Sequence, residues 1–480
     1  MSYIKDPNYE TILRRRRSRK RRKRFIHKVS SAVIFVSITL TIGIGGFFCV
    51  RAIQKHNIHL PFSDESSAEA GDGEASSPSL FISSEPSGID SQLAQADLLA
   101  AGYDYDGAIA LLQSIPDYQT NEQITQAIAG YEATKATLVE ADISKVTHVF
   151  FHSLIMDTSK AFDGDADSKG YNSVMTTKDE FIKILNSLYE KGFVLVRLHD
   201  MAYETTNENG NTVMQKGSIL LPPGKQPLVM SQDDVCYYEY MSDDGFASRI
   251  VIGEDGKPTC EMVLDDGTVS TGAYDLIPIL EEFIQEHPDF SYKGARAVIA
   301  LTGYNGIFGY RTDESYRDSN PNLEEDRKQA AQVAQCLRDN GWELASHSWG
   351  HRDLGSISME HFYSDTDKWE SQVESLIGPT DIILFPFGSD VGDWRPYTVD
   401  NERFQYLHSK GFRYFCNVDS AQYWVQLGSD HLRQGRRNLD GYRMWMDIEA
   451  GTDSSKRKLD DLFHAEDVFD PARPTPVEWN

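Results

Sequence analysis

Apolar and polar positions form alternating blocks along most of this chain, and the blocks change from strand-like to helix-like and back. Short apolar runs typical of buried strands are separated by longer amphipathic stretches with helical spacing. The predicted strands are 147–152, 193–198, 227–230, 297–301, 343–346, 381–384 and 414–418, and the predicted helices are 178–191, 276–287 and 327–340. This alternation predicts a parallel α/β barrel-like domain over residues 143–480, in which catalytic groups gather at the carboxyl ends of the strands.

An insertion interrupts the alternation at residues 247–268. Two short apolar runs there are bounded by Asp255-Gly256 and Asp266-Gly267. Asp-Gly pairs favour tight turns between antiparallel strands, so the insertion is predicted to be a β-hairpin.

A helical segment is predicted ahead of the barrel, at residues 89–142. Its apolar residues recur at helical spacing, and the stretch 102–112 (GYDYDGAIALL) resembles part of a tetratricopeptide repeat. It amounts to about one and a half units, too few for a solenoid. A segment that packs on the next domain is favoured, and a protein partner bound through it remains the alternative. The polar residues 52–88 are predicted to be a disordered linker.

Charge divides the chain sharply. Residues 1–28 contain 12 Lys/Arg and 2 Asp/Glu, a net of +10; the whole chain carries −26, so the remainder carries −26 − 10 = −36. An uncharged stretch rich in Ile, Val and Phe follows the basic tract, and its length suits a membrane-spanning helix at 29–51. Residues 1–28 would then stay in the cytoplasm as a basic tail. This arrangement predicts a single-pass membrane protein with an extracellular catalytic domain.

Two other interpretations of the N-terminal region are less favoured. A basic tract alone could indicate nucleic acid, but its position before the apolar stretch argues for membrane topology and no nucleic-acid partner. A cleaved secretory signal would need small residues at the cleavage site, whereas Phe47-Phe48-Cys49 is bulky. The other four cysteines have no CxxC spacing, so one disulfide or buried free thiols remain open.

Candidate chemistry lies directly after three predicted strands: Asp233-Asp234, the pair His347 and His351, and Pro386-Phe387-Gly388. One carboxylate and two imidazoles can hold a divalent metal, of which zinc is favoured, and leave one position open for water. A second carboxylate can then act as base on that water. Each element alone has a plainer explanation in turn chemistry or in chance spacing on a helix. Their shared position after strands favours one hydrolytic site.

Three motifs in order resemble the polysaccharide deacetylases with the NodB homology domain, carbohydrate esterase family 4. The family has Thr-Phe-Asp-Asp-Gly, His-Ser/Thr-x-x-His and Arg-x-Pro-Tyr/Phe-Gly motifs. This chain has SQDDV at 231–235, HSWGH at 347–351 and LFPFG at 384–388. The resemblance covers roughly residues 145–480 and implies a distorted (β/α) barrel of the NodB type.

The resemblance also implies a role for each matching residue. Asp233 would be the catalytic base, and Asp234, His347 and His351 the metal ligands. The backbone N–H of Phe387 would help to hold the oxyanion. The implied reaction is removal of N-acetyl groups from a cell-wall or extracellular polysaccharide. An O-acetyl glycan esterase, or a non-catalytic glycan-binding protein with a degenerate deacetylase fold, is the alternative.

The chain departs from the family pattern at several positions. Val235 stands where the family has Gly, and Leu384 stands where it has the Arg that orients the base. The usual C-terminal Leu-x-His is missing. The opening VFFHS at 149–153, together with residues 175–196, resembles the permuted poly-N-acetylglucosamine deacetylase branch, in which the acid histidine comes first. This resemblance assigns the general acid to His152; a buried core histidine is the alternative for this residue, and His464 is the second candidate for the acid.

Overall fold

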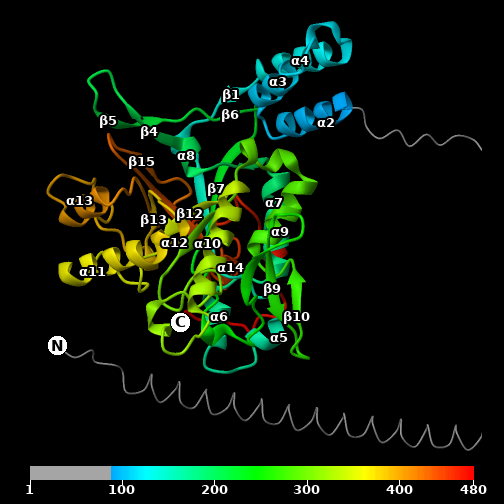
Figure 1. Cartoon of the computed structure of the whole chain (residues 1–480). Coiled ribbons are helices and arrows are strands. Elements are labelled where there is room, and N and C mark those ends of the chain that lie inside the picture. The colour runs from blue at the N-terminus through cyan, green and yellow to red at the C-terminus, as the bar shows by residue number, and fades with distance from the viewer. Residues whose placement is uncertain (1–87, 480) are drawn as a thin grey trace, which may run out of the picture. The chain divides into compact units, whose positions relative to one another are not determined.

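A closed ring of seven parallel strands forms the centre of the computed structural model, which describes residues 88–479 (Figure 1). The ring closes because β7 pairs with both β2 and β11. In spatial order the strands are β7 (Gln226–Gln232), β11 (Val298–Leu301), β12 (Glu343–Ser346), β13 (Ile382–Leu384), β14 (Tyr414–Val418), β16 (Leu432–Asn438) and β2 (Thr147–Phe151). The predicted α/β barrel is therefore confirmed.

Two further strands extend the ring. β3 (Phe193–Leu195) pairs with the first half of β7, while β11 takes the second half of the same β7 edge. The predicted strand at 193–198 is thus shorter than expected, because β3 ends at Leu195 and α8 (Leu198–Met201) already begins at Leu198. β15 (Val425–Leu427) adds an antiparallel edge to β16.

The barrel strands have two different faces. Alternate side chains point inward, and the apolar ones form a buried cluster that includes Val146, Val229, Val298, Ile382, Leu384 and Leu432. The outward-facing side chains join a larger cluster with the apolar faces of the surrounding helices. The longer of these helices are α7 (Lys178–Glu190), α9 (Leu276–Glu286), α10 (Leu323–Asp339), α11 (Met359–Trp369), α13 (Glu402–Ser409) and α14 (Gly441–Ala450). Burial of alternating residues on both faces fixes the register of each strand.

One barrel strand, β16, could not be predicted from the spacing of apolar residues. β16 reads LRQGRRN, yet residues 432–437 are all buried. Arg433 and Arg437 face outward and pair with Asp390 and Asp461, whereas Gln434 and Arg436 enter the barrel interior. Buried polar side chains need polar partners, and the side chains of this strand have them. Because the strand lacks alternating apolar residues, the sequence pattern did not predict it.

Three helices precede the barrel: α2 (Gly88–Ala101), α3 (Tyr105–Gln113) and α4 (Glu122–Lys135). They enclose a small apolar cluster of their own and dock onto the barrel domain through the turn after α2. There the Gly102 carbonyl accepts from Lys293 N at 2.7 Å, and the Tyr103 hydroxyl donates to the Asp289 carbonyl at 2.8 Å. The predicted basic tail 1–28, anchor 29–51 and nearly all of the linker 52–88 lie outside the described residues. Among residues 88–479, no helix is both long and apolar enough to cross a membrane.

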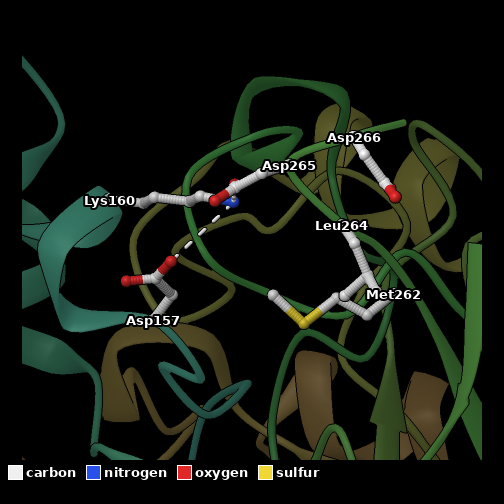
Figure 2. Close-up of a pocket in the computed structure, with 6 residues that line it drawn as sticks. All are labelled: Asp157, Lys160, Met262, Leu264, Asp265 and Asp266. Atoms are coloured by element: carbon white, nitrogen blue, oxygen red, sulfur yellow. Dashed lines mark ion pairs between the residues drawn. The ribbon is translucent and has the colours of Figure 1, made fainter. Parts of the chain in front are cut away.

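The insertion is a three-stranded antiparallel sheet, one strand more than the predicted hairpin. Its strands are β8 (Arg249–Ile252), β9 (Pro258–Val263) and β10 (Val269–Gly272). Figure 2 shows the cavity of about 390 Å³ beside it, where Lys160 reaches Asp265 and lies 3.8 Å from Asp157. No residue that lines this cavity belongs to the predicted metal site.

The remaining elements are short. β1 (Val139–Glu140) pairs with β6 (Leu220–Leu221), and β4 (Ala202–Thr206) pairs with β5 (Thr212–Lys216). The short helices are α5 (Thr158–Ala161), α6 (Ser168–Val174), α12 (Ser375–Ile377) and α15 (Ala465–Val468). Cys236, Cys260, Cys336 and Cys416 are buried free thiols, so among the described cysteines the alternative without a disulfide is correct.

A charged cluster joins α8 to the amino-terminal ends of two barrel strands. His199 Nε2 lies 3.1 Å from both carboxylate oxygens of Asp381, and Nδ1 bonds Glu343. Partial burial alone would lower the pKa of His199, but the bonds to the two carboxylates raise it to about 10. The folded state therefore binds a proton at His199 more tightly than the unfolded chain does.

This cluster predicts a pH-dependent stability. Because the pKa of His199 is raised on folding, its contribution is complete below about pH 6.5, the unfolded pKa, and is lost as pH rises through about 10. His199 is 42% exposed on its side chain, so solvent screening should limit the contribution to about 1 kcal/mol. Urea unfolding between pH 6 and 10 should show a smaller alkaline decline in His199→Gln than in wild type. The exposed His361→Gln serves as control, and equal declines in all three proteins would contradict the prediction.

Candidate metal centre and active site

The predicted site residues come together at the carboxyl-terminal mouth of the barrel. Asp233 and Asp234 directly follow β7, His347 directly follows β12, and Phe387 lies three residues after β13. His152 directly follows β2, the neighbour of β7. Parallel strands that end at one rim are the reason that residues distant in the sequence meet here.

Asp234, His347 and His351 form a group suited to a metal ion. One potential ligand atom from each residue lies within 4.8 Å of the others, and Nε2 of His351 is 3.5 Å from Asp234 Oδ2. The set of one carboxylate and two imidazoles matches the donors of catalytic sites that keep one position open. These three residues therefore fit a divalent ion.

Hydrogen bonds outside this group orient its ligands. His347 Nδ1 donates to the Leu384 carbonyl at 2.7 Å, which leaves Nε2 unprotonated and directed at the group. Burial lowers the pKa of His347 and so favours the neutral ring. Asp234 Oδ1 accepts from the Tyr238 hydroxyl at 2.6 Å. Outer contacts of this kind are typical of metal ligands.

The two histidines lie on a loop and not on a helical face, contrary to what the spacing alone suggests. Asp365, nearly buried, accepts the backbone N–H groups of Trp349 and Gly350 at 2.8 Å each. His351 has φ of 48°, and Asp234 and Phe387 also have positive φ, 58° and 57°. Non-glycine residues rarely adopt this region, and such strain gathers at functional sites. The loop directs both imidazoles toward Asp234.

Asp233 stands beside the metal group without belonging to it. Its Oδ2 lies 3.7 Å from His347 Nε2, and its Oδ1 accepts from Arg436 Nη1 at 2.7 Å. Burial would raise the pKa of Asp233, but the charge of Arg436 and its hydrogen bond outweigh burial and lower it below the ordinary range. Asp233 is therefore a carboxylate, able to accept a proton.

Arg436 is the functional residue that sequence analysis missed. The family places the base-orienting arginine at the position of Leu384, whose side chain here packs in the barrel interior. The guanidinium comes instead from β16, two strands along the ring from β7, and it is fully buried. The sequence signal that could have identified Arg436 was the unusual RQGRRN run at 433–438, because arginines in a buried strand need charged partners.

His152 lies at the mouth next to the two carboxylates. Its Nδ1 donates to the Val174 carbonyl at 3.0 Å, so Nε2 is the nitrogen available to a substrate. The ring is partly exposed, which sets it apart from a core histidine. The structure does not bring His464 to the mouth: its side chain is 61% exposed and bonds Asp460 at 3.2 Å.

Three aromatic residues in the loops that follow barrel strands differ in their exposure. The Phe387 ring meets His351 edge-on at 4.5 Å and is 72% exposed, and Trp394 is 77% exposed. Trp349, by contrast, is covered: Lys368 Nζ lies 3.1 Å from its ring centre, and its Nε1 donates to Gln372. Phe387 and Trp394 therefore offer free ring surface, and Trp349 does not.

Part of the chain is similar to a known protein family. Residues 301–414 match the model of the polysaccharide deacetylases, a stretch that includes the histidine loop and the turn at Phe387. Residues 301–414 are thus similar to the polysaccharide deacetylases, in agreement with the resemblance predicted from the three motifs. The match supports a hydrolase. The Asp233-Asp234 pair precedes the matched stretch, and the inserted sheet and α9 lie between them.

Two other comparisons add little. No curated protein matches the chain. Among solved structures, it is similar to the Streptococcus pyogenes deacetylase PplD in complex with acetate, at 12% identity over 62% of this chain and 93% of that one, with a TM-score of 0.30.

Removal of one imidazole should strongly weaken metal binding. We expect His347→Ala to lose most of the bound divalent ion, because only two of the three protein ligands remain. The hydrogen bond from the ring to the Leu384 carbonyl, which orients the ligand, is lost as well. Metal content after dialysis, measured by elemental analysis, checks this. His464→Ala is the matched control and should keep one ion per chain. An unchanged metal content in His347→Ala would remove this residue from the ligand set.

Proposed function

We propose that this chain is a metal-dependent deacetylase that removes N-acetyl groups from an extracellular amino-sugar polymer of the peptidoglycan or poly-N-acetylglucosamine type. The observation that carries the proposal is the group of Asp234, His347 and His351 with the unligated Asp233 beside it. A non-catalytic glycan-binding protein would have no need for a buried base held by its own arginine.

Each residue has a distinct part in the proposed reaction. A divalent ion held by Asp234, His347 and His351, zinc by preference, would lower the pKa of a bound water toward neutrality. Asp233 accepts the proton of the attacking water as its oxygen adds to the acetyl carbonyl carbon. The N–H of Phe387 donates to the developing oxyanion.

The second half of the reaction needs an acid. As the C–N bond breaks, the sugar nitrogen must gain a proton to leave as an amine, and His152 Nε2 supplies it. The bond from Nδ1 to the Val174 carbonyl fixes the ring so that Nε2 faces the mouth. The products are acetate and a free glucosamine-type unit.

Acetate release from three polymers tests the proposal. Poly-N-acetylglucosamine and peptidoglycan carry N-acetyl groups, and acetylxylan carries only O-acetyl groups. We expect acetate and free amine in equal amounts from at least one of the first two. Release from acetylxylan alone would instead indicate an O-acetyl esterase, and no release from any polymer would favour a glycan-binding role.

We further propose that residues 29–51 anchor the chain in the cell membrane with residues 1–28 inside. The support for the anchor is the change from +10 to −36 across this stretch. Protease added to intact cells should then degrade the catalytic domain and spare an epitope in residues 1–28. Release of the domain into the medium, about fifty residues shorter than the full chain, would contradict the anchor.

A further inference from the structure

A row of buried polar side chains lies inside the barrel beneath Asp233. It consists of His148 on β2, Ser231 on β7, and Gln434 and Arg436 on β16. These strands are neighbours in the ring, and Arg436 stands opposite His148 in the register. All four side chains are at most 1% exposed. Buried polar groups at the centre of an apolar barrel need a specific reason.

The hydrogen bonds of this row run in one direction. Gln434 Nε2 donates to the Val146 carbonyl at 2.9 Å, so its Oε1 faces His148 Nδ1 at 3.1 Å. A carbonyl oxygen only accepts, and Nδ1 therefore carries the proton of the neutral ring. Burial, and then the charge of Arg436, lower the pKa of His148 and keep the ring neutral.

The remaining bonds lead from His148 to the base. With its proton on Nδ1, the ring accepts at Nε2 from the Ser231 hydroxyl at 3.0 Å. The oxygen of Ser231 then accepts from Arg436 Nη1 at 3.2 Å. The same Nη1 donates to Asp233 Oδ1 at 2.7 Å. One guanidinium nitrogen thus joins the buried row to Asp233.

We propose that His148 and Ser231 are positioning residues for Asp233, acting through Arg436. This inference rests on the proposed function, in which Asp233 is the base. The Ser231 oxygen accepts from Arg436 Nη1 at the place where this nitrogen meets Asp233. The other contacts of the guanidinium, Nε with the Asn417 carbonyl at 3.3 Å and the Phe150 ring at 4.5 Å, do not involve Nη1. A base displaced by a fraction of an ångström loses much of its effect.

A pair of substitutions at one position separates positioning from simple packing. In His148→Gln the new amide oxygen reaches the place of Nε2 and can accept from Ser231. In His148→Asn the shorter side chain reaches only the place of Nδ1, so the bond to Ser231 is lost. Both changes remove the ring and add no charge. We expect His148→Asn to lower kcat by about 10- to 100-fold with KM and metal content unchanged, and His148→Gln to recover most of that loss.

Ser231→Ala should give the same loss of kcat as His148→Asn. Its matched control is Ser291→Ala, far from the mouth. Ser291 is also a buried serine that donates to a carbonyl, Ala295 at 2.7 Å, and accepts from an arginine, Arg296 Nη1 at 3.3 Å. Ser291→Ala should change thermal stability and leave kcat as in wild type. If it lowers kcat as much as Ser231→Ala does, the buried row is only structural and the inference fails.

Two readouts on the full chain keep this inference separate from the proposed function. If wild type releases acetate and both His148→Asn and Ser231→Ala keep kcat within twofold, the positioning role is wrong and the function stands. Histidine-selective ¹⁵N NMR needs no activity: it should show His148 with a protonated Nδ1 and an accepting Nε2 in wild type, and an altered Nε2 signal in Ser231→Ala. A protonated Nε2 in wild type would overturn the chain of bonds even if no polymer is a substrate.

Discussion

Asp233→Asn is expected to lower turnover by about 10² or more while the chain keeps its full complement of metal. The change leaves Asp234, His347 and His351 intact, so the ligand set is complete. It removes the group that accepts the proton from the attacking water. It also removes the charge that pairs with Arg436, so the buried guanidinium loses its ionic partner and stability should fall as well.

Comparison of neighbouring carboxylates makes this prediction specific. Asp234→Asn should lose both metal and activity, because it removes the anionic ligand. Asp447→Asn controls for the general cost of a buried carboxylate, since Asp447 accepts from the backbone of Lys458 and Leu459 away from the mouth. It should lower stability and leave turnover per folded chain unchanged. If Asp233→Asn keeps wild-type turnover, the base has been assigned to the wrong residue.

His152→Ala should also keep the metal and lose about 10² or more of turnover, for a different reason. A general acid must carry a proton to act, so the rate of the wild-type protein should fall on the alkaline side of its pH profile. Without the imidazole that alkaline limb should disappear from the pH profile. The measurement is kcat/KM for acetate release across pH 5 to 10, with metal content determined in parallel.

His464→Ala is the control for the acid. The ring of His464 is exposed and bonds Asp460, so its loss should leave both turnover and the pH profile unchanged. Full activity in His152→Ala together with a loss in His464→Ala would reverse the assignment. It would also remove the argument for the permuted branch of the family.

Apolar periodicity predicted most of the barrel, because most of its strands bury apolar side chains on both faces. β7, β11, β12, β13 and β14 end within two residues of their predicted ends. β16 escaped prediction because its buried face carries Gln434 and Arg436, which meet polar partners and not an apolar core. A polar barrel interior is invisible to a rule that equates burial with hydrophobicity.

The sequence also predicted part of the candidate site. Side chains that directly follow a strand, such as Asp234 and His347, could be placed because strand ends share one rim. The contact of Arg436 with Asp233 could not be predicted, since it depends on which strand lies two places along the ring. The loop conformation of His351 was also missed, because it is fixed by Asp365 from a later helix.

Metal removal and restoration tests the central claim most directly. Full-length protein is stripped with a chelator, and acetate and free amine released from poly-N-acetylglucosamine and peptidoglycan are measured while Zn²⁺ is added back. The account predicts no release from the stripped protein, recovery that is complete at one ion per chain, and equal amounts of acetate and amine. Undiminished release from metal-free protein, or acetate without a matching amine, would contradict it.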